Sequence, residues 1–390
     1  RTRINREVEK LNGEGDTIHL DKPAATMIDT AKAEASPEER ARALYELLPP
    51  ELKQSTKFRG VWEKGTPAGD KKKALRALET RLNLDLALQF GDRVDLPRSL
   101  VSTGTLTVAV GVSDEVLLAA AQEVGVIAEE HELLSWARGV VEKMRIEGGI
   151  NHSWLKPYLT NDCNPYMLNR QQARAQGVPA FVRGGTPKFP RSGAVLKGAQ
   201  GKRNNSATMN LASQRGWYAR WTVQALGVPS GSTFMAATLV STLFTQLEIA
   251  GVVGSVPSKS GGRIYFLAPG TVVISKEEEP ELLECSVCRM SVGVDAAARA
   301  VLDGQVCFSL DCEGRFEITG VEDNYYRQLY QSHNTRTVVA QEHTGLVGTA
   351  ERKRIEDQFK APTGQQEADS PNVLVATPTL EMGIDIGDLS

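Results

Sequence analysis

Long hydrophobic runs are absent from this sequence. No stretch of about 18 consecutive apolar residues occurs in the chain, which excludes a conventional membrane-spanning helix. The opening residues, Arg1 to Arg6, have no hydrophobic signal core and do not begin with Met. We therefore expect a piece of a longer cytoplasmic protein that has no membrane partner.

Acidic residues are missing from a long central part of the chain. None occurs from Cys163 to Leu247, and the segment's formal charge is about +10, so the remainder sums to about −13. This asymmetry favours a polyanion, and we expect nucleic acid, with DNA the favoured form. The alternative is a solvated basic surface without a ligand. The basic residues of this acid-free segment are Arg170, Arg174, Arg183, Lys188, Arg191, Lys197, Lys202, Arg203, Arg215 and Arg220.

Cysteine is scarce, yet four of the five cysteines fall close together. Cys285 and Cys288 form a C-x2-C pair, and Cys307 and Cys312 form a C-x4-C pair after a gap of 18 residues. Two such pairs can supply four thiolates to a closed, structural zinc shell. The spacing favours metal ligation over disulfides, as expected in a reducing cytoplasm. The alternative is four buried thiols without a metal, and Cys163 is expected to be a plain thiol.

The first segment, residues 1–112, is predicted to be mixed and mostly helical. Ser36, Pro37 and Glu39 form a capping box at a helix start. Leucines at helical spacing predict a helix from Asp70 to about Phe90, and residues 100–111 alternate in the manner of a strand.

The second segment, residues 113–280, is predicted to be a basic domain that resembles a winged helix. Two helices, at 217–226 and 234–250, precede a glycine-rich turn at 259–263 and an apolar run. Helix, helix and hairpin in this order are typical of a winged helix, and the alternative is an ordinary α+β subdomain. Residues 281–320 then form the expected zinc knuckle.

The last segment, residues 321–390, is predicted to begin an α/β domain. Residues 337–340 form a short apolar strand, residues 350–360 a helix, and residues 373–376 a second apolar strand suited to a parallel sheet. In this arrangement ligands bind at the carboxyl ends of the strands.

Two motifs in this segment resemble those of a known family. His343 to Leu346, which reads H-x-G-L and is followed by arginines and Phe359, is similar to motif IV of superfamily 2 helicases. Val375 to Asp385 is similar to motif V. The last 65 residues or so thus resemble the second RecA-like domain of a DEAD/DEAH-type helicase. The preceding cysteine knuckle further resembles large bacterial helicases, some of which belong to phage-defence systems such as Druantia and DISARM.

The resemblance implies a fold and a set of functional residues. The fold is α/β plus α+β, a partial RecA-like parallel domain preceded by helical and winged-helix-like domains and the zinc knuckle. Alone, His343 would be interpreted as a packed histidine that caps a loop. The nucleic-acid strand would contact His343, Thr344, Thr377 and Thr379, besides Lys202 and Arg203 of the acid-free segment; the nucleotide would contact Gly383 and Asp385.

The phosphate-binding loop G-x-x-x-x-G-K-S/T is absent, and the sequence ends before the arginine-finger motif that follows motif V. We therefore expect the full-length protein to use ATP with Mg and this piece alone to be inactive. Its expected protein partners are other subunits of a defence complex. Two alternatives remain open: a non-enzymatic nucleic-acid-binding module with structural zinc, and a structural zinc protein whose Rossmann-like end binds another ligand.

Overall fold

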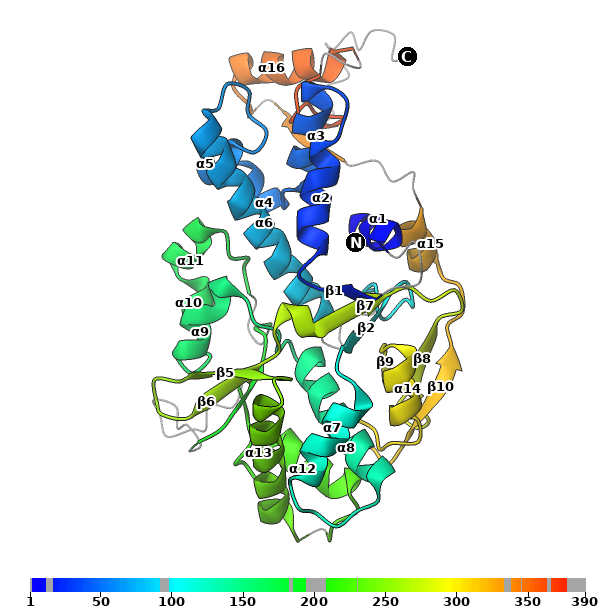
Figure 1. Ribbon diagram of the computed structural model, residues 1–390. Helices are drawn as coiled ribbons and strands as arrows, with labels where there is room; N and C mark the ends of the chain where they lie inside the picture. The colour runs from blue at the N-terminus through cyan, green and yellow to red at the C-terminus, as the bar shows by residue number, and fades with distance from the viewer. Residues whose placement is uncertain are drawn as a thin grey trace. The chain divides into compact units, whose positions relative to one another are not determined.

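The computed structural model describes residues 2–11, 17–91, 98–181, 185–193, 208–229, 231–332, 338–344, 346–362 and 366–376. In these ranges the protein is mixed α/β, with helices and several small sheets (Figure 1). None of the helices in them combines the length and apolar character that a membrane crossing requires.

The chain divides into two compact units. The first contains residues 1–24 and 81–333, and the second contains residues 25–80 and 334–390. The cysteine knuckle thus belongs to the first unit. Residues 334–390, the part that resembles a helicase domain, share the second unit with residues 25–80. The division into four segments stays a prediction.

The first unit is built on α-helices and short strands. Its helices are α1 (Thr2–Leu11), α7 (Asp114–Gln122), α8 (Glu130–Ile146), η1 (Ser153–Leu155), α9 (Lys156–Thr160), α10 (Tyr166–Asn169), α11 (Gln171–Gln176), α12 (Trp217–Ala225), α13 (Thr233–Ile249), η2 (Pro269–Thr271), α14 (Ala296–Leu302) and α15 (Tyr325–Gln331). Its strands are β1 (Ile18–His19), β2 (Thr107–Val110), β3 (Phe189–Arg191), β4 (Thr208–Asn210), β5 (Gly254–Pro257), β6 (Arg263–Phe266), β7 (Val272–Ser275), β8 (Glu281–Cys285), β9 (Ser291–Val292) and β10 (Phe316–Gly320).

Three small sheets organise this unit. The strand orders are β1-β7-β2, β4-β3-β6-β5 and β10-β8-β9. All the pairings are antiparallel except that of β3 with β4, which is parallel.

The second unit contains α3 (Pro37–Leu47), α4 (Pro50–Lys53), α5 (Thr56–Arg59), β11 (Ala340–His343), α16 (Thr349–Lys360) and β12 (Val373–Ala376). Two further helices, α2 (Pro23–Lys32) and α6 (Ala68–Phe90), run across the division in sequence. Strands β11 and β12 pair in parallel, as predicted for this α/β element.

Helix α8 forms the centre of the first unit. It packs against α7, α12, α14 and β2, and thirteen of its residues are buried. Two of these, Glu142 and Arg145, form an ion pair at 2.7 Å although both are almost fully buried. Glu142 also accepts a hydrogen bond from the backbone N–H of Val110, and Arg145 donates to the carbonyls of Phe90 and Gly293. The pair therefore ties β2, the end of α6 and the segment before α14 to one helix.

Several predicted elements are confirmed. The capping box at α3 is complete, with Ser36 Oγ accepting from the Glu39 N–H and the Glu39 carboxylate accepting from the Ser36 N–H. Helices α12 and α13 followed by the β5–β6 hairpin give the predicted helix, helix and hairpin order. The winged-helix assignment itself stays a prediction.

The strand predicted at residues 100–111 is wrong in its first part, because only Thr107–Val110 are extended. Residues 99–105 instead form turns. Hydroxyl groups of Ser99, Ser102 and Thr103 bond nearby backbone groups there, and Gly104 has a φ of 64°. Such local hydrogen bonds compete with a strand ladder.

We predict that Glu142→Gln lowers the free energy of unfolding by about 3–5 kcal/mol, because the guanidinium of Arg145 would stay buried without its counter-charge. Urea denaturation measures this loss. The control is Glu130→Gln, an exposed position on the same helix, which should change stability by less than about 0.5 kcal/mol. Equal, small effects at the two positions would show that the buried pair does not hold the unit together.

Candidate metal centre

The first cysteine pair lies on a tight turn between β8 and β9. Cys285 is the last residue of β8, and its N–H donates to the carbonyl of Met290. The N–H of Arg289 donates back to the carbonyl of Cys285, and Arg289 has a positive φ of 59°. These bonds fold the chain back over three residues, so Cys288 lies beside Cys285.

The second pair lies on the loop between α14 and β10. The N–H of Cys307 donates to the carbonyl of Gly314, and the N–H of Cys312 donates to that of Ser309. The backbone N–H of Ser286 reaches across to the carbonyl of Arg315, which joins this loop to the first turn. The two turns therefore face each other.

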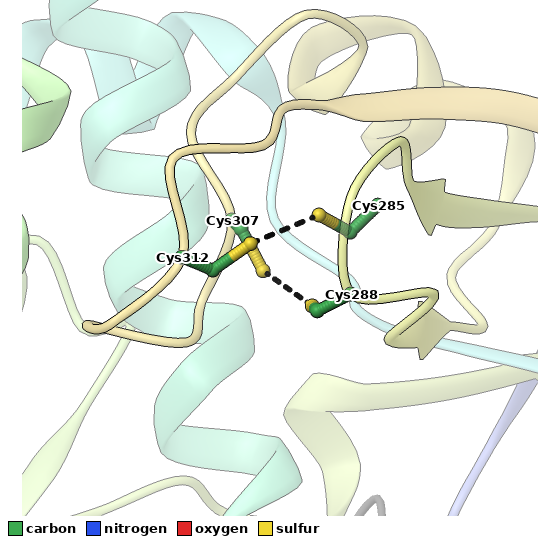
Figure 2. A group of neighbouring side chains, drawn as sticks. All are labelled: Cys285, Cys288, Cys307 and Cys312. Atoms are coloured by element: carbon green, nitrogen blue, oxygen red, sulfur yellow. Dashed lines mark hydrogen bonds between the residues drawn. The ribbon is translucent and has the colours of Figure 1, made fainter.

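All four sulfur atoms meet between these turns (Figure 2), and each Sγ lies within 4.8 Å of the other three. The Sγ–Sγ distances from Cys285 to Cys312 and from Cys288 to Cys307 are both 3.5 Å. A tetrahedral zinc ion with Zn–S bonds of about 2.3 Å separates its sulfurs by about 3.8 Å. The cluster fits a structural zinc ion in size and in donor type, as the cysteine spacing predicted.

Backbone amides donate hydrogen bonds to two of the sulfurs. The N–H groups of Ser309 and Gly314 donate to the sulfurs of Cys307 and Cys312, at 3.3 and 3.4 Å. Burial acts to raise the pKa of the Cys285 thiol, but hydrogen bonds from the backbone of Cys288 and Val287 and from the Cys312 and Cys288 side chains outweigh it and lower that pKa to about 7. Burial raises the pKa of the Cys288 and Cys307 thiols. Thiolates are the form that binds metal, and donors of this kind orient them.

Gly314 is required by the packing around the sulfurs. A Cβ at this position would lie 2.4 Å from the Sγ of Cys285 and 2.9 Å from the Cβ of Val287. No larger side chain fits without displacing a ligand. The contact of Gly314 with Cys285 joins two residues that lie almost thirty positions apart in sequence.

Of the residues that the helicase resemblance assigns to binding, His343 and Thr344 lie inside the described part of the second unit. His343 is buried, and its Nε2 lies 2.6 Å from a carboxylate oxygen of Glu356 on α16. That geometry is the one expected of a packed histidine. Thr344 is half-buried, and its hydroxyl donates to Glu342. A role for either residue in strand binding stays a prediction.

Six predicted binding residues lie outside the described residues: Thr377, Thr379, Gly383, Asp385, Lys202 and Arg203.

The acid-free segment contains structural cations as well as exposed ones. Lys188 Nζ lies 2.6 Å from a carboxylate oxygen of Glu147. Burial acts to raise the pKa of that carboxyl, but the positive charges of Lys143 and Lys188 outweigh burial and lower the pKa to about 2. Arg191 is fully buried and donates to Ser260 and Gly261. These two cations stabilise the fold.

The exposed cations of the acid-free segment in the described residues are Arg174, Arg215 and Arg220. Arg220 lies 3.3 Å from Asp311 on the loop between α14 and β10, which we call the metal loop. Arg174 has a 3.4 Å contact with Asn169. Fewer cations are therefore available to a polyanion than the ten counted in the sequence, because acids outside the segment, Glu147 and Asp311, pair with some of them.

We predict one zinc ion per chain, bound by Cys285, Cys288, Cys307 and Cys312. Cys288→Ser should abolish zinc binding and locally unfold the knuckle, because metal binding supplies folding free energy at such sites. Elemental analysis of natively purified protein measures it. Cys163→Ala removes the remaining cysteine, which is distant in sequence, and should leave the zinc content unchanged. Wild-type protein without zinc would contradict the assignment.

Comparisons with protein-family models, with curated proteins and with solved structures found no match for this chain.

Proposed function

We propose that the chain forms part of an ATP-dependent nucleic-acid helicase of superfamily 2, in which it contributes strand binding and half of the ATP cleft. One observation carries this proposal: β11 and β12 pair in parallel, with His343 opposite Ala376. The residues that follow them in sequence, Thr344 and Thr377, are two of the four that the helicase motifs assign to the nucleic acid.

The parallel pairing matters because it puts the carboxyl ends of both strands at one edge of the sheet. Helix α16 lies between the strands in sequence and packs on β11, which gives the strand, helix and strand order of an α/β domain. Ligands of such sheets bind at this edge. The two motifs are more than 30 residues apart in sequence, and the pairing brings their starting points together.

The packed geometry of His343 suggests how the first motif works. Its imidazole is held by Glu356, so we infer that it fixes the end of β11 against α16. Thr344, the next residue, then lies at the sheet edge, where its hydroxyl would exchange its bond to Glu342 for one to a phosphate. In this proposal His343 positions the strand-binding loop, and Thr344 and Thr377 contact phosphate.

Nucleotide binding is assigned to the same edge. Gly383 would allow the backbone to approach the nucleotide, and Asp385 would contact its ribose. ATP with Mg supplies the phosphoanhydride whose hydrolysis drives translocation. The phosphate-binding loop would come from a first motor domain of the full-length protein, and other subunits of a bacterial defence complex are its proposed partners.

The zinc ion has a structural role in this proposal. Cys285, Cys288, Cys307 and Cys312 would hold the ion with four thiolates, which would leave no position open for a substrate.

A second candidate function is a non-enzymatic nucleic-acid-binding module. The observation that favours it is the exposure of Arg174 and Arg215 in a segment without acids. Lys202 and Arg203 belong to the same segment. This candidate shares strand binding with the helicase but requires no nucleotide turnover, so ATP hydrolysis by the full-length protein distinguishes the two.

We predict that the affinity for DNA falls log-linearly with salt, since cations that neutralise phosphates release counterions. Replacing Lys202 and Arg203 together by Gln should weaken binding to all sequences alike and reduce the salt slope by about two phosphate equivalents. Titrations by fluorescence anisotropy at several salt concentrations measure the slope. The control is Lys188→Gln, because Lys188 is already paired with Glu147. An unchanged slope in the double variant would show that this stretch is only a solvated surface.

We predict that Thr377→Ala and Asp385→Ala separate strand binding from nucleotide turnover in the full-length protein. Thr377→Ala removes a hydroxyl that reaches a phosphate and should cost about 1–2 kcal/mol in strand binding. Asp385→Ala should lower strand-stimulated ATP hydrolysis and leave strand affinity intact. Each variant serves as the control for the other. If neither alters binding, hydrolysis or unwinding, the likeness to motif V is a coincidence of a strand and a turn.

A further inference from the structure

One face of α12 is bonded to the loop that carries the second cysteine pair. The side chains of Trp217, Trp221 and Gln224 project at helical spacing, and each donates a hydrogen bond to a carbonyl of this loop. The acceptors are Phe308 at 2.7 Å, Val306 at 3.4 Å and Leu310 at 3.4 Å, respectively. These carbonyls surround Cys307 in sequence and lead toward Cys312.

Aromatic packing reinforces the same contact. The rings of Trp217 and Trp221 are stacked at 5.0 Å, and Phe308 lies against both at 5.8 and 5.5 Å. Phe308 also packs on Phe316, the first residue of β10, at 5.0 Å. Phe308 directly follows Cys307 in the chain, so the residue after a metal ligand is enclosed by two indole rings and a phenyl ring.

Helix α12 is also packed against α8. Trp221 fits against Gly139 of α8, where a Cβ would approach the indole ring to 2.2 Å. Trp136 of α8 donates to the hydroxyl of Thr222 at 2.9 Å. A displacement of the metal loop therefore has to move α12, which is packed against α8, or break its hydrogen bonds.

Helix α12 also belongs to the acid-free segment. Arg215 and Arg220, two of its exposed cations, lie just before α12 and on it. A nine-residue helix is not stable by itself in water, so the order of α12 depends on its contacts. Helix α13 is its most extensive neighbour, and α8, β4 and the metal loop supply the other contacts.

We propose that the metal centre holds α12, and with it Arg215 and Arg220, in the conformation that binds nucleic acid. Trp217, Trp221 and Gln224 are the positioning residues that transmit metal occupancy. This inference rests on the zinc site and strand binding of the proposed function and adds a linkage between them. Without the metal, residues 306–312 lose their anchor and α12 loses the carbonyls that accept its hydrogen bonds.

Hydrogen–deuterium exchange on the natively purified chain tests the linkage, with zinc content measured before and after chelation. Zinc removal should speed amide exchange at least about tenfold in residues 217–225 as well as in residues 285–312. Helix α3, in the other unit, serves as the internal control and should not change. Loss of protection confined to residues 285–312 would overturn the linkage and leave the zinc site intact. Protein purified without zinc would overturn both.

A variant with the metal in place tests the contact itself. Trp217→Phe keeps a ring but removes the donor to the Phe308 carbonyl, and it should retain zinc while weakening single-stranded DNA binding about threefold to tenfold. Trp154→Phe, a matched change in the same unit, should alter neither zinc content nor affinity. Zinc retention with wild-type affinity in Trp217→Phe would count against transmission through this residue. Loss of zinc from Trp217→Phe, with Trp154→Phe unaffected, would instead support the coupling from the opposite direction.

Discussion

The buried ion pair of Glu142 and Arg145 is the constraint on which the first unit depends. Taking two charges out of water is costly, and the cost is offset only where further hydrogen bonds satisfy both groups. Here the carboxylate also accepts the N–H of Val110, and the guanidinium reaches the carbonyls of Phe90 and Gly293. The same bonds that stabilise the charges define where three separate segments meet α8. The buried pair therefore specifies how β2, the end of α6 and the segment before α14 are placed around α8, besides contributing to stability.

The metal centre depends on that arrangement. Gly293 precedes α14 and the second cysteine pair, and Gln305, just before Cys307, donates to Ser135 of α8 at 2.7 Å. Helix α12 then lies between α8 and the metal loop, bonded to both. The cysteine shell is therefore not an independent knuckle on a flexible arm. It closes a loop that also contacts α12 and α8, which is why occupancy and helix position are expected to be linked.

Sequence reasoning succeeded where the determining interactions are local or depend on spacing. The capping box of α3 involves residues three apart, and within each cysteine turn the backbone bonds join residues at most seven positions apart. The parallel pairing of β11 and β12 followed from two apolar runs around a helix, although β11 begins three residues later than predicted. It failed where partners are distant. Arg191 counted as surface charge, yet it is buried against Ser260, about seventy positions later. The alternation at 100–111 was likewise overridden by hydroxyl groups that bond their own backbone.

His343 illustrates how a proposed motif and a packing role can coincide. From the sequence, an H-x-G-L element after a strand suggested contact with nucleic acid, and a lone histidine suggested a capped loop. In the structure its ring nitrogen is bonded to Glu356 on α16, so the side chain points into the unit. Because His343 fixes the end of β11, it also fixes the position of the next residue, Thr344. The parallel pairing of His343 with Ala376 then sets the position of Thr344 relative to the end of β12. Motif residues can thus act on a ligand without touching it, because the position of a loop at a sheet edge is decided by what the preceding side chain packs against.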